Sequence, residues 1–120
     1  MRVLIVEQNR DLAALWKGHL DRLGAEVDML HSVNAAEEAV NSTNYNAVVL
    51  DLAEAQAGCF ELADVIAYRW PDTRIVFVTG STFFSDGSLF GYVSNAAAMV
   101  PREAPPEDLA AVVEHHAMRS

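Results

Sequence analysis

Three runs of apolar, largely β-branched residues constrain the fold of this chain more than any other feature of its sequence. They occupy residues 3–6, 46–52 and 74–79. Because the apolar residues follow one another without alternating with polar ones, each run suits a strand that is buried on both faces of a sheet. Two weaker segments, 26–30 and 96–100, are plausible second and fifth strands.

Segments with helical periodicity separate these runs. The first predicts a helix with one apolar face, after which Gly24 is a natural C-terminal stop. A capping box at 34–37 is expected to open a short helix that continues through Val40. A third helix must end before Pro71, and a last one begins at 105–106 with proline in its first turn. The apolar face of the first helix comprises Leu12, Leu15, Trp16, Leu20 and Leu23. The third helix is indicated by Phe60, Ala63 and Ile66, with Leu62 beside them, and the last is continued by Leu109, Val112, Val113 and His116.

Five strands that alternate with helices predict the α/β class, with a doubly wound parallel sheet and helices on both of its faces. At 120 residues the chain is expected to form one domain, residues 1–120. In sheets of this kind, functional sites form beyond the carboxyl ends of the strands. The residues at those ends are Glu7 and Gln8, Asp51, Thr79, and Pro101 with Arg102.

The strand-end residues point to phosphoryl chemistry. If the first and third strands are neighbours, Glu7 and Asp51 approach each other and repel unless a cation lies between them. Mg²⁺ prefers such oxygen ligands and keeps several waters. Asp51 could then attack a phosphoryl group, and the Thr79 hydroxyl could donate a hydrogen bond to one of its oxygens.

Composition excludes several classes of function. The formal net charge of −9 makes the chain a poor candidate for binding nucleic acid. No apolar run approaches the roughly 20 residues of a membrane span. Cys59 is the only cysteine, so no internal disulfide can form, which favours a reducing, cytoplasmic setting. Cys59 itself is expected to be a small half-buried helix residue rather than a nucleophile.

Five motifs, in order, resemble those of the receiver domain of bacterial two-component response regulators. Each motif is weak alone, but their order and spacing are right over nearly the whole chain. They are the opening strand with its polar pair at 3–12, the strand bearing the aspartate at 48–52, Gly58 with Phe60-Glu61-Leu62, the strand ending in threonine at 76–79, and Pro106-Glu107-Asp108-Leu109.

The resemblance implies a flavodoxin-like (βα)5 fold with strand order 2-1-3-4-5. It implies that Asp51 accepts a phosphoryl group from a histidine kinase or phosphotransfer protein. Mg²⁺ would be held by Glu7, Gln8, Asp51 and the backbone carbonyl of Ala53. The acyl phosphate would then alter the face formed by helix four, strand five and helix five, which a downstream protein or effector domain reads. Such a domain is not a turnover enzyme.

The departures from the family pattern are also informative. Gln8 replaces a carboxylate that usually contacts the metal, so the affinity for Mg²⁺ should fall. The family's lysine after strand five is missing: ungapped alignment puts Pro101 there, whereas one residue of slack puts Arg102 there. Ala98 or Met99 stands in place of the switch aromatic.

These departures leave an alternative, a pseudo-receiver that acts as an interaction or dimerisation module without phosphate. Phe83, Phe84, Leu89, Phe90 and Tyr92 either cover the sheet or form a partner or homodimer surface. A flavodoxin-like cofactor binder is disfavoured because residues 7–10 contain no phosphate-binding glycine. If the chain is complete, it has no room for a DNA-binding domain and its output passes through a protein partner.

Overall fold

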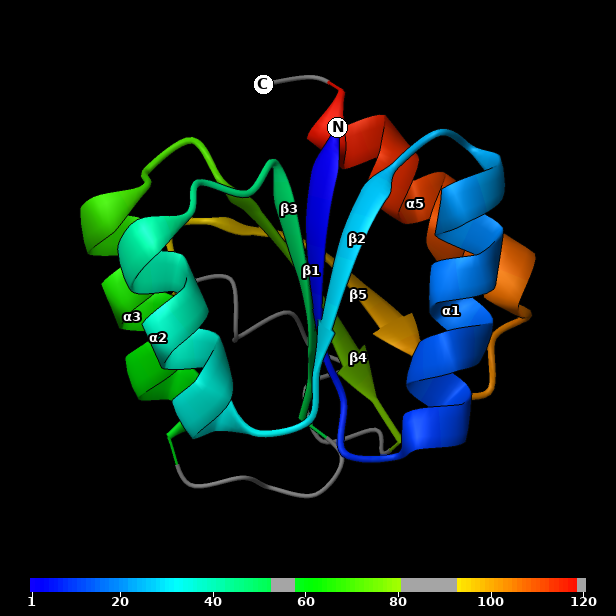
Figure 1. Cartoon of the computed structure of the whole chain (residues 1–120), viewed down its shortest axis with the longest axis horizontal. Coiled ribbons are helices and arrows are strands. Elements are labelled where there is room, and N and C mark those ends of the chain that lie inside the picture. The colour runs from blue at the N-terminus through cyan, green and yellow to red at the C-terminus, as the bar shows by residue number, and fades with distance from the viewer. Residues whose placement is uncertain (53–57, 81–92, 119–120) are drawn as a thin grey trace.

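The computed structural model describes residues 1–52, 58–80 and 93–118, in which strands and helices alternate (Figure 1). The order of the elements is β1 (Arg2–Val6), α1 (Arg10–Arg22), β2 (Glu26–Leu30), α2 (Val33–Ser42), β3 (Ala47–Asp51), α3 (Cys59–Arg69), β4 (Arg74–Thr79), β5 (Ala96–Pro101) and α5 (Pro106–Ala117).

The five strands form one parallel sheet in the order β2-β1-β3-β4-β5. Helices α2 and α3 cover one face of it, and α1 and α5 cover the other (Figure 1). The predicted doubly wound sheet and its strand order are therefore confirmed.

Alternate residues of the central strands pack into two separate cores. On β1, Leu4 and Val6 face α2 and α3, whereas Val3 and Ile5 face α1 and α5. Strands β3 and β4 follow the same alternation, and nearly all of their residues are buried. Burial on both faces explains why these strands read as continuous apolar runs.

Strand β5 carries a bulge that shifts its register by one residue. Ile75 of β4 pairs with Ala96, but the next residue, Val76, pairs with Ala98, so Ala97 is extra. The packing changes phase at the same point, because Ala96 joins the core under α2 and α3 whereas Ala98 joins the opposite core. As a result Thr79 pairs with Pro101 at the end of the sheet.

The predicted apolar face of α1 is partly wrong. Trp16 and Leu20 are buried with Ala13, but Leu15 and Leu23 are 47% and 42% exposed. Leu15 lies about 100° around the helix from Trp16, at the margin of the buried stripe. Leu23 is the C-cap and has left the helix.

The ends of two helices follow from their capping contacts. Gly24 ends α1 with a φ of 87°, and the amides of Gly24 and Ala25 bond the carbonyls of Asp21 and Leu20, as in a Schellman motif. The predicted capping box at 34–37 is wrong. The side chain of Ser32 accepts from the Ala35 amide at 3.1 Å, so α2 begins earlier and continues past Val40 to Ser42.

Gly58 positions the start of α3 beside α2. Its φ is +99°, a conformation that L side chains rarely adopt, and an added Cβ would lie 3.3 Å from Cγ1 of Val33. Both constraints favour glycine at this position. The third helix ends at Arg69, before Pro71, as predicted.

Within the described ranges, no helix combines the length and the hydropathy needed to cross a bilayer. The apolar and aromatic residues between 83 and 92, predicted to cover the sheet or bind a partner, lie outside the described residues.

Two leucines of α1 test this account of the core. Leu20 is fully buried, so Leu20→Ala should lower the free energy of unfolding by about 2–5 kcal/mol. The matched variant Leu15→Ala removes the same atoms from the helix margin and should cost less than about 1 kcal/mol. Urea unfolding of both variants measures the difference, and equal losses would contradict the assigned helix face.

Candidate functional site

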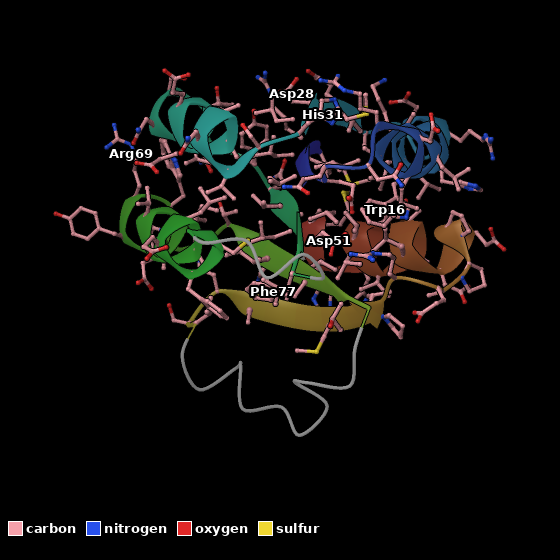
Figure 2. All side chains as sticks on the ribbon, turned by 90° about the horizontal axis from the view of Figure 1, so that it is seen from below. Trp16, Asp28, His31, Asp51, Arg69 and Phe77 are labelled. Atoms are coloured by element: carbon pink, nitrogen blue, oxygen red, sulfur yellow. The ribbon has the colours of Figure 1, made fainter. Side chains whose placement is uncertain are left out.

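Four adjacent strand ends bring the candidate residues to one edge of the sheet. Glu7 follows β1, Asp51 ends β3, Thr79 ends β4, and Arg102 follows β5. Because the strands are parallel and neighbouring, their carboxyl ends meet there. Figure 2 is a view onto this edge, with Asp51 near its centre.

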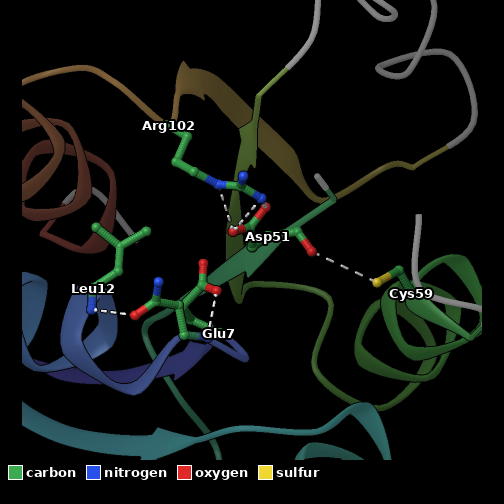
Figure 3. Close-up of polar contacts among 6 residues, drawn as sticks. Glu7, Leu12, Asp51, Cys59 and Arg102 are labelled. Atoms are coloured by element: carbon green, nitrogen blue, oxygen red, sulfur yellow. Dashed lines mark hydrogen bonds and ion pairs between the residues drawn. The ribbon is translucent and has the colours of Figure 1, made fainter. Parts of the chain in front are cut away.

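Asp51 and Arg102 form a forked ion pair (Figure 3). Nε of Arg102 donates to Oδ2 of Asp51 at 3.2 Å, and Nη2 lies 3.1 Å from both carboxylate oxygens. The Asp51 side chain is 5% exposed and that of Arg102 32%. The Arg102 amide donates to the Thr79 carbonyl at 2.8 Å, which holds the arginine next to the aspartate.

The bulge in β5 determines which residue reaches Asp51. Of the two positions considered for the missing lysine, Pro101 is the last residue of β5 and pairs with Thr79. If the same sequence paired without the bulge, Thr79 would pair with Val100, and Pro101 would come next. With the bulge, the first residue beyond the strand is Arg102.

Glu7 is a buried carboxylate that points toward Asp51 (Figure 3). It is 3% exposed, and its Oε2 accepts from the Asn9 amide at 2.9 Å. Oε1 is buried and has no hydrogen-bond partner within the described part of the chain. Burial raises the pKa of Glu7 to about 7. Asp51 acts in the same direction, because only the protonated form of Glu7 can donate a hydrogen bond to it, whereas the Asn9 amide and Arg102 act in the opposite direction.

The oxygen atoms at this edge fit a magnesium ion. A partnerless buried oxygen on Glu7, beside the Asp51 carboxylate, suits a hard cation. Gln8 is exposed and could add a neutral amide oxygen, whereas the predicted ligand Ala53 lies outside the described residues. No group of three or more His, Cys, Asp or Glu side chains suited to a metal occurs among the described residues. A metal here would therefore keep several water ligands.

Two hollows border the site and share Glu7 and Gln8. The smaller has a volume of about 20 Å³, enough for about one water. The larger, about 280 Å³, is open and borders Arg102. The smaller hollow is lined by Val6, Glu7, Gln8, His31, Ser32, Val33, Asp51 and Cys59. The larger is lined by Glu7, Gln8, Asn9, Leu12 and Arg102.

The structure places two further residues at the site that sequence reasoning did not include. Nδ1 of His31 lies 3.0 Å from the Glu7 carbonyl, and His31 directly follows β2, so the strand-end rule could have found it. Sγ of Cys59 lies 3.9 Å from the Asp51 carbonyl. Burial, with the charges of Asp51 and Glu61, raises the pKa of this thiol to about 11, which disfavours a nucleophilic thiolate.

The raised pKa of Glu7 predicts a pH-dependent stability. Below pH 4.5, its ordinary pKa, Glu7 is protonated in both folded and unfolded chains; as the pH rises through about 7 the folded protein must hold a buried charge. The contribution of Glu7 to the free energy of unfolding therefore falls as the pH rises from 4.5 to about 7. Relative to wild type, Glu7→Gln should gain up to about 3 kcal/mol in free energy of unfolding from pH 4.5 to 8. Urea unfolding in chelator measures it, and a constant difference across pH would contradict the raised pKa.

Comparisons with known proteins agree with this fold. No protein-family model and no curated protein matches the sequence. A receiver domain (CheY-like) of Methanospirillum hungatei is 19% identical, with a TM-score of 0.86 over 98% of this chain and 94% of that chain. The non-phosphorylated HemR receiver domain of Leptospira biflexa is 25% identical, with a TM-score of 0.81 over 97% and 93%. The response regulator TrrA of Thermotoga maritima, in complex with Mg²⁺-BeF, is 23% identical, with a TM-score of 0.78 over 95% and 96%. The predicted resemblance is thus confirmed at the level of the fold, which is that of response-regulator receiver domains.

Proposed function

We propose that this chain is a two-component receiver that accepts a phosphoryl group onto Asp51 from a histidine kinase or phosphotransfer protein. The observation that carries the proposal is the placement of Asp51. It is a buried carboxylate at the end of a central strand, with Glu7 on one side and the Arg102 guanidinium on the other. The similarity to TrrA, solved in complex with Mg²⁺-BeF, supports the same reading.

In the proposed step, a carboxylate oxygen of Asp51 attacks the phosphorus of the donor. A new oxygen–phosphorus bond forms while the bond between phosphorus and the donor breaks, and the donor leaves with its electron pair. The Thr79 hydroxyl donates to one phosphoryl oxygen, and Arg102 transfers its hydrogen bonds from the carboxylate to the phosphoryl group. Mg²⁺, held by Glu7, Gln8, Asp51 and the Ala53 carbonyl, would neutralise charge on the phosphoryl oxygens when bound.

The proposed output is a change in the face that includes β5 and α5. The position expected for the switch aromatic holds Ala98 or Met99, so the relay cannot depend on an aromatic ring in β5. The reader of this face is a downstream protein or an effector domain, or a second copy of the chain. We propose a cytoplasmic setting without nucleic-acid or membrane contact, and a relay role rather than catalytic turnover.

Two observations favour a second function, that of a phosphate-independent pseudo-receiver. Gln8 removes one negative charge from the metal site. Arg102 places a positive charge of the chain itself against Asp51. A chain with these features could use the receiver fold as a binding module alone.

Phosphorylation can be tested by intact-mass spectrometry after incubation with acetyl phosphate, with and without Mg²⁺. We expect a phosphoryl adduct on wild type that requires Mg²⁺ and disappears in Asp51→Ala, because the acceptor oxygen has been removed. Asp64→Ala, which removes an exposed carboxylate from α3, is the matched control and should keep the adduct.

Two results would count against the proposal. An adduct that persists in Asp51→Ala would place the acceptor elsewhere. A folded wild type that gains no adduct from acetyl phosphate or from a phosphorylated phosphotransfer protein would favour the pseudo-receiver.

A further inference from the structure

The hydrogen bonds from Arg102 occupy most of the acceptor capacity of Asp51. An ionised carboxylate offers roughly four acceptor positions on its two oxygens. Arg102 fills three of them, one on Oδ1 and two on Oδ2. A cation or a phosphoryl donor that approaches these oxygens therefore meets a guanidinium already in place.

Arg102 also supplies the charge that a metal would otherwise supply. With Glu7 and Asp51 both ionised, the site holds two negative charges and one positive charge, which leaves a single net negative charge. Gln8 adds none. An arriving divalent cation would be attracted by one net charge and repelled by the nearby guanidinium, so its binding is weaker than at a two-carboxylate site without the arginine.

The surroundings of Arg102 allow its side chain to leave Asp51. Its backbone is fixed by the hydrogen bond from its amide to the Thr79 carbonyl, but about a third of its side chain is exposed. It borders the open hollow of about 280 Å³ that Gln8, Asn9 and Leu12 also line. The guanidinium can therefore move into this hollow without displacing a packed core.

We propose that Arg102 competes with the divalent cation for Asp51: it is an internal counter-ion that stays paired with Asp51 until metal binding displaces it. This inference rests on the proposed magnesium-dependent function and adds its regulation. It follows that the Arg102 guanidinium covers the phosphoacceptor Asp51 whenever the free metal concentration is low.

The test measures metal binding directly and does not depend on phosphorylation. Mn²⁺ binding is followed by electron paramagnetic resonance, and Mg²⁺ binding by calorimetry, at one fixed pH for all proteins. The proteins are wild type, Arg102→Ala and Arg102→Gln; the glutamine variant keeps a polar side chain in case the alanine variant folds poorly. Arg22→Ala is the matched control, because it removes an exposed positive charge from the opposite end of the sheet.

Both Arg102 variants should bind Mn²⁺ and Mg²⁺ at least about tenfold more tightly than wild type, while Arg22→Ala should bind as wild type does. Added Mg²⁺ should likewise raise the melting temperature of the Arg102 variants more than that of wild type. Equal affinities in all four folded proteins would overturn the competition but leave the metal site, and hence the proposed function, intact. Absence of metal binding in every protein, including both Arg102 variants, would overturn the competition and the magnesium-dependent function together.

Discussion

The parallel register of β1, β3 and β4 is the constraint on which the remaining structure depends. These strands are sealed by one apolar core on each face, so a slip of one residue would exchange the two sets of side chains between cores of different shape. The register thus fixes where each strand ends. Glu7 and Asp51 approach each other as a result of core packing, although neither side chain contributes apolar contacts to it.

That packing also places two carboxylates where water is scarce. Asp51 is compensated by the Arg102 fork, whereas Glu7 has a raised pKa and one buried oxygen that no described residue contacts by a hydrogen bond. A buried charge without a partner costs free energy, and proteins tolerate such costs mostly where function requires them. The charges of Glu7, Asp51 and Arg102 at this edge therefore determine how tightly an external cation can bind there.

The sequence predicts the strands of the sheet well, but it predicts the buried faces and the ends of the helices less well. Strand β4 matches its predicted bounds because burial on both faces leaves a continuous apolar run, and β2, whose residues are exposed or half-buried, matches bounds predicted from a weaker pattern. The predicted buried face of α1 is too wide, because the spacing of apolar residues does not distinguish Leu15, at the margin of the buried face, from Leu20, at its centre. The cap of α2 was misplaced because Ser32 and Asn34 are both competent caps, and only the backbone direction selects Ser32.

At the site, the strand-end rule found Glu7, Asp51 and Thr79 but left Pro101 and Arg102 as alternatives. The choice depended on a bulge with no signal in a run of consecutive alanines. The same rule applies to His31, which directly follows β2 and contacts the Glu7 carbonyl. The contact of Cys59 with the Asp51 carbonyl was not predictable, because it depends on how α3 approaches the sheet.

The bulge at Ala97 has a consequence for how such sites diverge. With the bulge, each residue after Ala97 pairs one position earlier on β4 than unbroken pairing from Ala96 would give, and it lies on the opposite face of the sheet. The same sequence therefore presents a guanidinium rather than an imino acid beyond the end of β5, because the bulge lets Pro101 complete the strand. Column-by-column alignment assigns such a change to the wrong residue, whereas counting from the paired strand identifies it correctly.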